Sequence, residues 1–308
     1  MPRGRTGFAG ALRQVSALGL LNTVDASASW VLGSQFAFAA LAITWNLGMV
    51  GQMKAHIVLA HPDARSFNGH LANLSHNTLT AAGYDCTLSD LYGMDFDPRE
   101  GAHQYRFRED EAVFHPQSEQ RFNAQNGTTP EDVAAEITRL LGCDLLVVHF
   151  PLWWFGPPAI LKGWMDRVFV YGRVYRSTMR YDTGIGAGKR MIACVTTGAS
   201  ADNCAHNGRE GDTRLHLWPI LYPFRYLGMD VLEPEVMHGV GSTAFMEGHE
   251  GGLSGLEEYS DRWRSVLQNL PSRQSVRYNS DREFDERKRL LPDAPSHTPF
   301  IRHRQDFG

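Results

Sequence analysis

The stretch from Cys143 to Phe169, CDLLVVHFPLWWFGPPAILKGWMDRVF, decides the fold of this chain. Its first eight residues form an almost continuous apolar run, which is typical of a strand covered on both faces of a parallel sheet. The pair Pro157-Pro158 then opens a helix, because proline fits the first helical position. The stretch therefore predicts a strand, a loop and a helix in succession. The helix has one apolar face, formed by Ile160, Leu161, Trp164, Met165, Val168 and Phe169.

The same alternation continues on both sides of this stretch. Residues 94–127 show no sustained period and predict a long loop. We expect Thr129 to cap the helix after that loop, and Pro219 and Pro223 to bend or break a later helix. Together the pattern predicts an α/β fold with a doubly wound, five-stranded parallel sheet. The other predicted strands are Lys54–Ala60, Asp85–Leu91, Met191–Val195 and Met229–Val236, and the other predicted helices span about 66–83, 130–141, 213–227 and 256–270.

We expect one α/β domain over residues 53–270, between two segments of different composition. Residues 1–52 lack the alternation and predict a non-folding extension, or an early start with Met53 as the natural beginning. The alternative is a membrane anchor or a cleaved leader, because no charge occurs from Ala26 to Met53. Polar residues and glycines in that stretch weaken the membrane reading. Residues 271–308 are charged and punctuated by proline, which predicts an extended tail that wraps a partner subunit.

Composition excludes several classes of function. With 30 Lys+Arg against 34 Asp+Glu, the chain lacks the basic field of a nucleic-acid-binding protein. The sequence has no HExxH pair and no GxSxG elbow, so zinc and serine hydrolases lack support. We expect no metal site and no disulfides, a reducing compartment such as the cytoplasm, and no membrane association. The expectations about metal, disulfides and compartment rest on four cysteines without CxxC or Cys/His spacing: Cys86, Cys143, Cys194 and Cys204.

Three loops that follow predicted strands are candidates for a binding site, because open parallel sheets bind ligands at the carboxyl ends of their strands. The first, HPDARSFN from His61 to Asn68, combines a helix N-terminus with Arg65 and suits a diphosphate. The second, PLWWFG over 151–156, holds three aromatic rings that cannot all face the core and suits a flat ligand. The third, TTGAS over 196–200, lets backbone N–H groups approach a ligand. Each loop taken singly also fits an ordinary turn.

Five stretches together resemble the NAD(P)H:quinone oxidoreductase (DT-diaphorase-like) family of flavodoxin-like flavoproteins. They are HIVLAHPDARSFNGHL, FPLWWFGPPAILKGWMDRVF, VTTGAS, GREGDTRLHLWPI and LGMDVLEPE, in this order over residues 53–270. The resemblance implies a homodimer with FAD at the carboxyl edge of the sheet and NAD(P)H as co-substrate. It also implies two-electron reduction of quinones or similar acceptors, in a ping-pong cycle with hydride transfer through flavin N5.

The resemblance assigns roles to residues of the three loops. The phosphates and the ribityl chain of the flavin would be bound by His61, Arg65, Ser66, Phe67 and Asn68. The isoalloxazine would be lined by Pro151, Leu152, Trp153, Trp154 and Phe155, the last two of which fix the ring plane for catalysis. Its pyrimidine edge would be held by Thr196, Thr197, Gly198 and Ala199. Tyr175 matches an aromatic position of the substrate pocket, contributed to the partner subunit.

Two departures from the family pattern bear on catalysis and specificity. Mammalian members carry a Tyr and a His after the TTG loop, a proposed proton relay, and Cys204 and Glu210 stand at those positions here. His206 could substitute for the relay, or backbone N–H groups near Thr197 could stabilise an anionic reduced flavin. A second substrate-pocket tyrosine is replaced by Ser177, so the preference for acceptors does not transfer.

Three other functions stay open at the level of the sequence. An FMN-dependent azo- or nitroreductase would use the same strand-end loops without contacts to an adenine. A flavodoxin-like electron carrier or a flavin-binding regulatory subunit of a membrane transporter would serve a partner instead of turnover. Extraction of the flavin and addition of NAD(P)H separate these possibilities.

Overall fold

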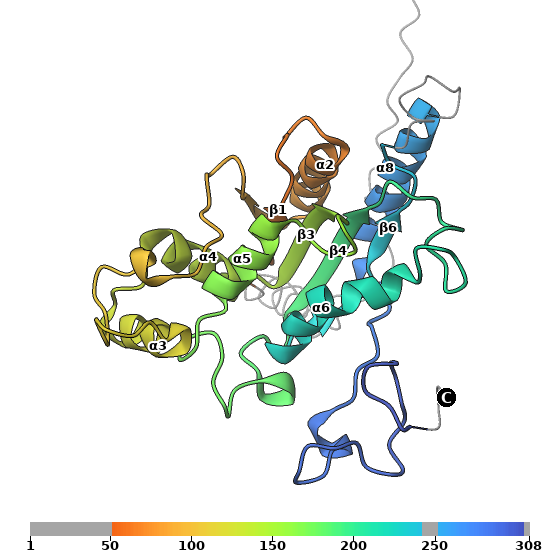
Figure 1. Cartoon of the computed structure of the whole chain (residues 1–308). Helices are drawn as coiled ribbons and strands as arrows, with labels where there is room; N and C mark the ends of the chain where they lie inside the picture. Colours follow the sequence, from red (N-terminus) through yellow and green to blue (C-terminus); the bar gives the residue numbers. More distant parts are fainter. Residues whose placement is uncertain (1–50, 242–251, 305–308) are drawn as a thin grey trace, which may run out of the picture. The chain divides into compact units, whose positions relative to one another are not determined.

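A parallel sheet forms the centre of the described chain (Figure 1). The computed structural model describes residues 51–241 and 252–304. The strand order is β2-β1-β3-β4-β5 with β6 also paired to β4, and every pair is parallel. This order confirms the predicted doubly wound sheet with five strand positions. The strands are β1 (Lys54–Leu59), β2 (Asp85–Asp90), β3 (Leu145–Pro151), β4 (Arg190–Thr196), β5 (Asp230–Val231) and β6 (Glu235–Met237).

The fifth position of the sheet is shared by two short segments. β5 pairs with the start of β4, where Arg190 faces Asp230, and β6 pairs with its end. Pro234 stands between the two segments and has no N–H to donate to a neighbouring strand. The predicted single strand over 229–236 is therefore interrupted at Glu233 and Pro234.

β1 and β3 are the central strands. All seven residues of β3 are buried, as is every residue of β1 after Lys54. β3 pairs with β1 on one side and with β4 on the other. Because helices cover both faces, the side chains on both faces of the strand bury apolar area. Each Å² of that area stabilises the fold by about 25 cal/mol. The continuous apolar run in the sequence of β3 follows from this double burial.

Helices cover the two faces of the sheet (Figure 1). In the described chain, one face carries α2 (Phe67–Ala81) and α8 (Gly252–Gln268). The opposite face carries α4 (Glu131–Gly142), α5 (Ala159–Val168) and α6 (Thr213–Tyr226). Successive residues of β1 point to opposite faces, so Ile57 belongs to the core under α2 and α8 and Val58 to the core under α4 and α5.

The segment predicted as a long loop over 94–127 contains a helix, so this prediction is wrong. α3 spans Pro116–Asn126, and a short 3₁₀ helix, Ala102–Gln104, precedes it. The buried side chains of α3 are polar, among them Glu119, which accepts a hydrogen bond from Arg108 at 2.7 Å. No apolar period marks such a helix in a sequence.

α6 runs unbroken over Thr213–Tyr226 although it contains Pro219 and Pro223, so the predicted break is wrong. Two prolines four residues apart lie on one face of a helix. They leave the carbonyls of Leu215 and Pro219 without an N–H donor, and both of these residues are exposed. Water can satisfy exposed carbonyls, which lowers the cost of the prolines.

α4 starts one residue later than predicted. Its first helical residue is Glu131, and Pro130 occupies the capping position without a side-chain hydrogen bond. The hydroxyl of Thr129 finds no partner in the described chain, so Thr129 does not cap the helix. The acidic first turn, Glu131 and Asp132, still favours the positive end of the helix dipole.

The chain after α8 returns along the edge of the sheet. The N–H of Glu233 donates to the carbonyl of Gln274, and the N–H of Val276 donates to the carbonyl of Val231, each at 2.8 Å. Val276 also packs against the core on the α6 face. Residues 274–276 therefore lie alongside β5, and the separation into domain and tail stays a prediction.

A buried carboxylate joins α4 to its neighbours. Glu136 accepts hydrogen bonds from Ser89 Oγ and Trp164 Nε1, both at 2.8 Å, and forms an ion pair with Arg139. Burial opposes ionisation of this carboxyl, but the neighbouring His56, Ser89 and Trp164 outweigh it and lower its pKa to about 2. Glu136 is therefore charged at neutral pH, and its buried charge depends on these donors.

A buried histidine lies on the opposite face, under α2 and α8. His149 Nε2 is 2.9 Å from Ser75 Oγ, which also donates to the Leu71 carbonyl (2.9 Å) and accepts from Trp263 Nε1 (2.8 Å). The hydroxyl has one hydrogen, used for Leu71, so His149 donates from Nε2 and leaves Nδ1 without a partner. Burial lowers the pKa of His149 to about 3, so the ring is neutral at neutral pH.

The predicted extension, with its uncharged stretch, falls largely on residues 1–50, which lie outside the described residues. A compact unit begins at Gln52. Over residues 51–241 and 252–304, no helix has both the length and the apolar character needed to cross a membrane.

Candidate functional site

Three strand-end loops meet where the strand order reverses, between β1 and β3. His61 follows β1 and Trp153 follows β3, and their ring centroids are 6.1 Å apart with an interplanar angle of 61°. Asn68 of α2 donates to Thr196 Oγ1, at the end of β4, at 2.8 Å. The structure thus brings the three candidate loops together at the position where open α/β sheets bind ligands.

Side chains and close packing fix the loop after β1. Ser66 caps α2, because its Oγ accepts from the N–H of Gly69 at 3.2 Å. A Cβ on Gly69 would lie 2.0 Å from the carbonyl oxygen of Ala64, so only glycine fits there. Arg65 donates two hydrogen bonds to Asp63, at 3.0 and 2.9 Å, which lower the pKa of Asp63 to about 2. The charge of Arg65, predicted to face a diphosphate, is therefore shared with Asp63.

The first turn of α2 offers an unpartnered acceptor beside this loop. Asn68 is buried, and its Nδ2 is used for Thr196, whereas its Oδ1 has no partner in the described chain. An unsatisfied buried acceptor costs about 1–3 kcal/mol. A hydroxyl of a bound ligand would offset that cost. Next to it, Phe67 stacks on His70 with centroids 5.9 Å apart.

The turn after β3 presents aromatic rings to solvent. The N–H of Trp153 donates to the carbonyl of Gly156 at 2.8 Å, and the N–H of Gly156 donates back at 3.0 Å. Trp154 and Phe155, between them, have φ of 50° and 62°, a left-handed backbone that costs non-glycine residues about 1 kcal/mol or more each. Trp154 is 95% exposed and Phe155 51%. Strained backbone under exposed rings indicates a functional role.

A hollow of about 420 Å³ adjoins this turn. The loop after β4 also lines it, and there Gly198 and Ala199 have backbone N–H groups that donate to no acceptor in the described chain. Free N–H groups and an aromatic ring in one hollow suit a planar heterocycle with a polar edge. The hollow is lined by Leu152, Trp154, Phe155, Thr197, Gly198, Ala199, Cys204, Arg209, Glu210 and His216.

The loop after β4 is held in place by the chain after β6. The N–H of Gly239 donates to the carbonyl of Ala199, and that of Val240 to the carbonyl of Thr197, each at 2.8 Å. Thr197 Oγ1 donates to the Ala199 carbonyl (2.9 Å) and lies 3.4 Å from His238 Nδ1. Burial lowers the pKa of His238, so the ring beside Thr197 is neutral at neutral pH.

Comparison with known proteins identifies the family of this chain. Residues 53–259, more than half of the chain, match a family described as having a flavodoxin-like fold. NAD(P)H dehydrogenase [quinone] 1 of Rattus norvegicus is 34% identical over 220 residues, which are 71% of this chain and 79% of that protein. The chain belongs to the NAD(P)H:quinone oxidoreductase family of flavodoxin-like proteins.

Further members of the quinone oxidoreductase family match over the same part of the chain. Ribosyldihydronicotinamide dehydrogenase [quinone] of Homo sapiens is 36% identical over 185 residues, covering 59% of this chain and 80% of that protein. A crystal structure described as a quinone reductase from Klebsiella pneumoniae superposes with a TM-score of 0.67 at 28% identity. That superposition covers 78% of this chain and 92% of that one. The resemblance seen in the sequence is thereby confirmed at the level of the family.

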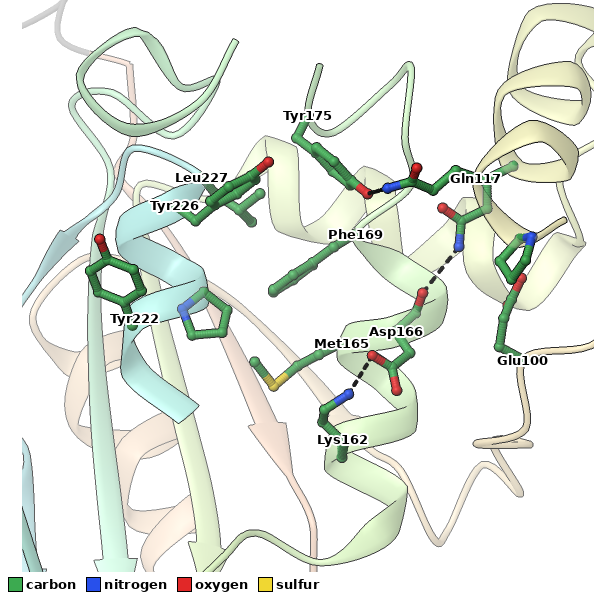
Figure 2. A pocket seen from close by; sticks show the side chains of 13 residues that line it. Glu100, Gln117, Lys162, Met165, Asp166, Phe169, Tyr175, Tyr222, Tyr226 and Leu227 are labelled. Carbon is green, nitrogen blue, oxygen red and sulfur yellow. Dashed lines mark hydrogen bonds and ion pairs between the residues drawn. The ribbon is translucent and has the colours of Figure 1, made fainter. Parts of the chain in front are cut away.

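Tyr175, which the resemblance to quinone oxidoreductases assigns to the partner's pocket, lies apart from the hollow. It lines a separate cavity of about 570 Å³ between α3, α5 and α6 (Figure 2). Gln117 Nε2 donates to its hydroxyl at 3.1 Å, and its ring meets Tyr226 edge-on with centroids 5.6 Å apart. Phe169 faces the same cavity. Within one chain, Tyr175 is thus not among the residues around the hollow.

The two predicted relay candidates of this quinone oxidoreductase family member have different positions. Glu210 lines the hollow and accepts from Asn203 Nδ2 at 3.4 Å, and its own N–H donates to the Asn203 carbonyl at 2.9 Å. His206 is exposed and does not line the hollow. Pro151 is the buried last residue of β3, opposite Thr196 in the sheet.

Sequence reasoning missed two histidines near the hollow. His216 lies in the first turn of α6, and its ring is 4.9 Å from that of Phe155. His238 follows β6 and contacts Thr197. A usable signal existed for His238, because it directly follows a strand.

Proposed function

We propose that this chain is a flavin-dependent NAD(P)H dehydrogenase that reduces quinones or similar acceptors. The observation that carries the proposal is the hollow at the strand-order reversal, which is lined by the exposed rings of Trp154 and Phe155 and by the free N–H groups of Gly198 and Ala199. The names of the rat and human relatives, both dehydrogenases of quinones, support it.

The residues present fit a flavin, and we propose FAD, with FMN as the alternative. The unpartnered Asn68 Oδ1 would accept from a hydroxyl of the ribityl chain, and the helix N-terminus after Ser66 would face phosphate. Arg65 lies exposed at that end, where it can reach a second phosphate while paired with Asp63. When bound, the flavin supplies two-electron transfer between NAD(P)H and the acceptor.

The chain's own groups position the reactants and stabilise charge. Trp154 and Phe155 would fix the plane of the ring, where misplacement of reacting atoms costs heavily in rate. The N–H groups of Gly198 and Ala199 would stabilise negative charge at the polar edge of the ring. Glu210 is the carboxyl that lines the hollow, so its side chain would exchange a proton with the reactants there. NAD(P)H and the acceptor would bind one after the other at the exposed face of the ring, as the proposed ping-pong cycle requires.

We also propose a homodimer. Trp154 exposes almost its whole ring, and Tyr175 lines an apolar cavity away from the hollow of its own chain. A second copy of the chain would cover the ring of Trp154, and the Tyr175 of each copy would lie at the hollow of the other. Sedimentation velocity should show a dimer at micromolar concentration, and a monomer would contradict this part of the proposal.

The four cysteines support a place in a reducing compartment, which we propose is the cytoplasm. All of them are free thiols, and three are buried: Cys143, Cys194 and Cys204. Titration of the denatured protein with a thiol reagent, without reductant, should find all four thiols.

The direct test is the absorbance spectrum of the purified protein, followed by chromatography of the released cofactor and anaerobic addition of NADPH or NADH. Release of FAD and bleaching by either nucleotide is the expected result. Release of FMN would favour an azo- or nitroreductase. A flavin that neither nucleotide bleaches would favour an electron carrier or a regulatory subunit. A colourless protein that cannot be reconstituted would overturn the site.

Trp154→Ala tests the role of the rim directly. We expect kcat/KM for the quinone reaction to fall about tenfold or more, because the ring plane is no longer fixed. The free energy of unfolding should stay within about 0.5 kcal/mol, because the ring is exposed. Phe107→Ala removes another exposed ring, away from the hollow, and should leave both quantities unchanged.

A further inference from the structure

A small cavity lies between α6, the connection from β5 to β6, and the segments 274–278 and 297–300. Its volume is about 370 Å³, toward the lower end of the range of about 300–1,000 Å³ that small-molecule sites occupy. It shares no lining residue with the hollow at the rim, and neither Tyr175 nor Ser177 lines it. The proposed reaction uses none of its side chains, so its composition needs its own explanation.

Apolar side chains form one part of this cavity. Leu217 and Leu221 of α6 line it and are buried. Trp218 of α6 and Tyr278 of the chain after α8 line it as well, with ring centroids 5.7 Å apart and an interplanar angle of 68°. Both rings are half-buried, so part of their surface stays open to a ligand. This part of the cavity favours an apolar or aromatic group.

Charged groups of both signs line the same cavity. Two are the guanidinium groups of Arg214 and Arg277, and two are the carboxylates of Asp212 and Glu233, beside His297. In the described chain, none of these two arginines and two acids forms an ion pair within 4.0 Å. Because the two signs cancel, the lining favours neither a simple anion nor a simple cation. Unpaired charges of opposite sign in one cavity suit a zwitterion.

The main chain holds Glu233 in place at the wall. Its N–H donates to the carbonyl of Gln274 at 2.8 Å, and its carbonyl accepts from Arg273 Nε at 3.0 Å. Glu233 is half-buried, and its carboxylate accepts no hydrogen bond in the described chain. Burial and the charge of Glu233 raise the pKa of Tyr278, so that hydroxyl stays protonated at neutral pH. A carboxylate that is positioned but unpaired can accept hydrogen bonds from an ammonium group.

Glu233 and Arg214 lie at the same end of the cavity. Both also line a neighbouring cavity of about 760 Å³, which neither Trp218 nor Leu221 lines. The small cavity therefore has a charged end, where it adjoins its neighbour, and an apolar end. Asp212 Oδ1 accepts from the N–H of Arg214 at 2.8 Å and caps α6, whereas the guanidinium of Arg214 donates no hydrogen bond in the described chain. The side chains of Glu233 and Arg214 are thus both available to a ligand.

We propose that this cavity binds a free α-amino acid with a large apolar or aromatic side chain. The carboxylate of the ligand would pair with Arg214, its ammonium group would pair with Glu233, and its side chain would lie against Trp218 and Leu221. An α-amino acid carries both charges on one carbon, which matches an acid and a guanidinium at one end of a cavity whose other end is apolar. A peptide, whose two charged ends are far apart, does not match this arrangement.

Calorimetric titration of the full-length protein with L-phenylalanine tests the site. Three further probes each lack one feature: 3-phenylpropionate lacks the ammonium group, 2-phenylethylamine lacks the carboxylate, and L-alanine lacks the ring. We expect L-phenylalanine to bind with a Kd at least about tenfold lower than that of each other probe. No binding of L-phenylalanine, or equal affinity for it and any other probe, would overturn the proposal. Because no turnover is measured, the outcome is independent of the reaction proposed for the rim.

Two variants tie the binding to this cavity, because each should affect a different pair of probes. Glu233→Gln should raise the Kd of L-phenylalanine and of 2-phenylethylamine about tenfold, without weakening the binding of 3-phenylpropionate. Arg214→Gln should raise the Kd of L-phenylalanine and of 3-phenylpropionate about tenfold, without weakening the binding of 2-phenylethylamine. A general loss of structure would weaken all three probes alike, so misfolding cannot produce this crossed result.

Glu286→Gln and Arg287→Gln are the matched controls, since both residues are exposed and lie outside the lining. They should leave every Kd unchanged. Equal changes for all three probes in Glu233→Gln and Arg214→Gln, or no change in either variant, would overturn the proposal.

Discussion

The rim of the sheet and the interior beneath it use tryptophan in opposite ways. Trp154 at the rim is 95% exposed on a left-handed turn held by one pair of backbone hydrogen bonds. Trp164 in α5 is fully buried and donates to the buried Glu136 carboxylate. The buried ring in the interior therefore stabilises the fold, whereas the exposed ring at the rim lies on a strained backbone that keeps it uncovered. The backbone under a ring, more than the ring itself, decides which role it has.

Trp164→Ala is the change that tests the interior side of this comparison most strongly. It removes a fully buried ring and leaves the Glu136 charge without one of its donors, so we expect a loss of about 3–5 kcal/mol in the free energy of unfolding. Trp164→Phe, which keeps most of the volume, should cost less and isolates the N–H. Urea unfolding measures both. A loss no larger than that of Trp154→Ala would break the comparison.

Because His149 is buried in the interior, the free energy of unfolding depends on pH. In the unfolded chain the imidazole takes up a proton below pH 6.5, but burial lowers its pKa in the folded protein to about 3. Between these values the unfolded state binds more protons, so the stability falls as the pH falls, by about 1.4 kcal/mol per pH unit. From pH 7 to pH 5 we expect a loss of about 2 kcal/mol from this residue.

His149→Gln is the control for that measurement, since its amide can still donate to Ser75 but does not titrate. Urea unfolding of both proteins at several pH values gives the difference in slope. If the free energy of unfolding changes with pH equally in the two proteins, the pKa of His149 does not differ between the folded and unfolded states, and the prediction is wrong.

Two glycines sharpen the comparison within the rim itself. An added Cβ at Gly69 would overlap the Ala64 carbonyl, whereas at Gly156 the nearest atom is the Trp153 oxygen at 3.9 Å. Gly69→Ala should therefore destabilise the protein by about 1–3 kcal/mol, and Gly156→Ala by less than about 0.5 kcal/mol. Thermal unfolding compares them. Similar midpoints for the two variants would mean that the loop after β1 yields as easily as the turn after β3.

The smallest expected effect concerns the strained backbone of the turn. Trp154→Gly removes the same ring as Trp154→Ala but relieves the left-handed φ of 50°. We expect the glycine variant to be more stable than the alanine variant by about 0.5–1 kcal/mol, with equally low turnover. Equal stability of the two would show that the turn carries no strain at this position.

The fold could be predicted from the sequence where burial leaves a periodic trace. β3 and α5 are marked by apolar runs because every position of the strand and one face of the helix are covered. α3 has no such trace, because its buried face is made of polar side chains such as Glu119 and Asn123 that depend on distant partners. Pairings of that kind arise only in the folded chain, so a sequence pattern cannot announce them.

In the candidate site, too, some residues could be predicted from the sequence and others could not. The three loops were predictable because each follows a strand and carries an unusual composition. His216 was not, because it reaches the hollow from a helix far along the chain, and nothing next to it in the sequence marks the ring of Phe155 as its neighbour. Likewise the pairing of Arg65 with Asp63 takes up a charge that the sequence left available for a phosphate.

The segment that runs beside β5 covers that border of the sheet. A strand at the border of a sheet offers unpaired backbone groups on which another chain can add a strand, a route to aggregation. Here the N–H of Glu233 and the carbonyl of Val231 are already hydrogen-bonded to the backbone of Gln274 and Val276. A chain shortened before Arg273 would expose that border while leaving the rim intact. The segment after α8 therefore keeps this border from pairing with another chain, independently of the rim.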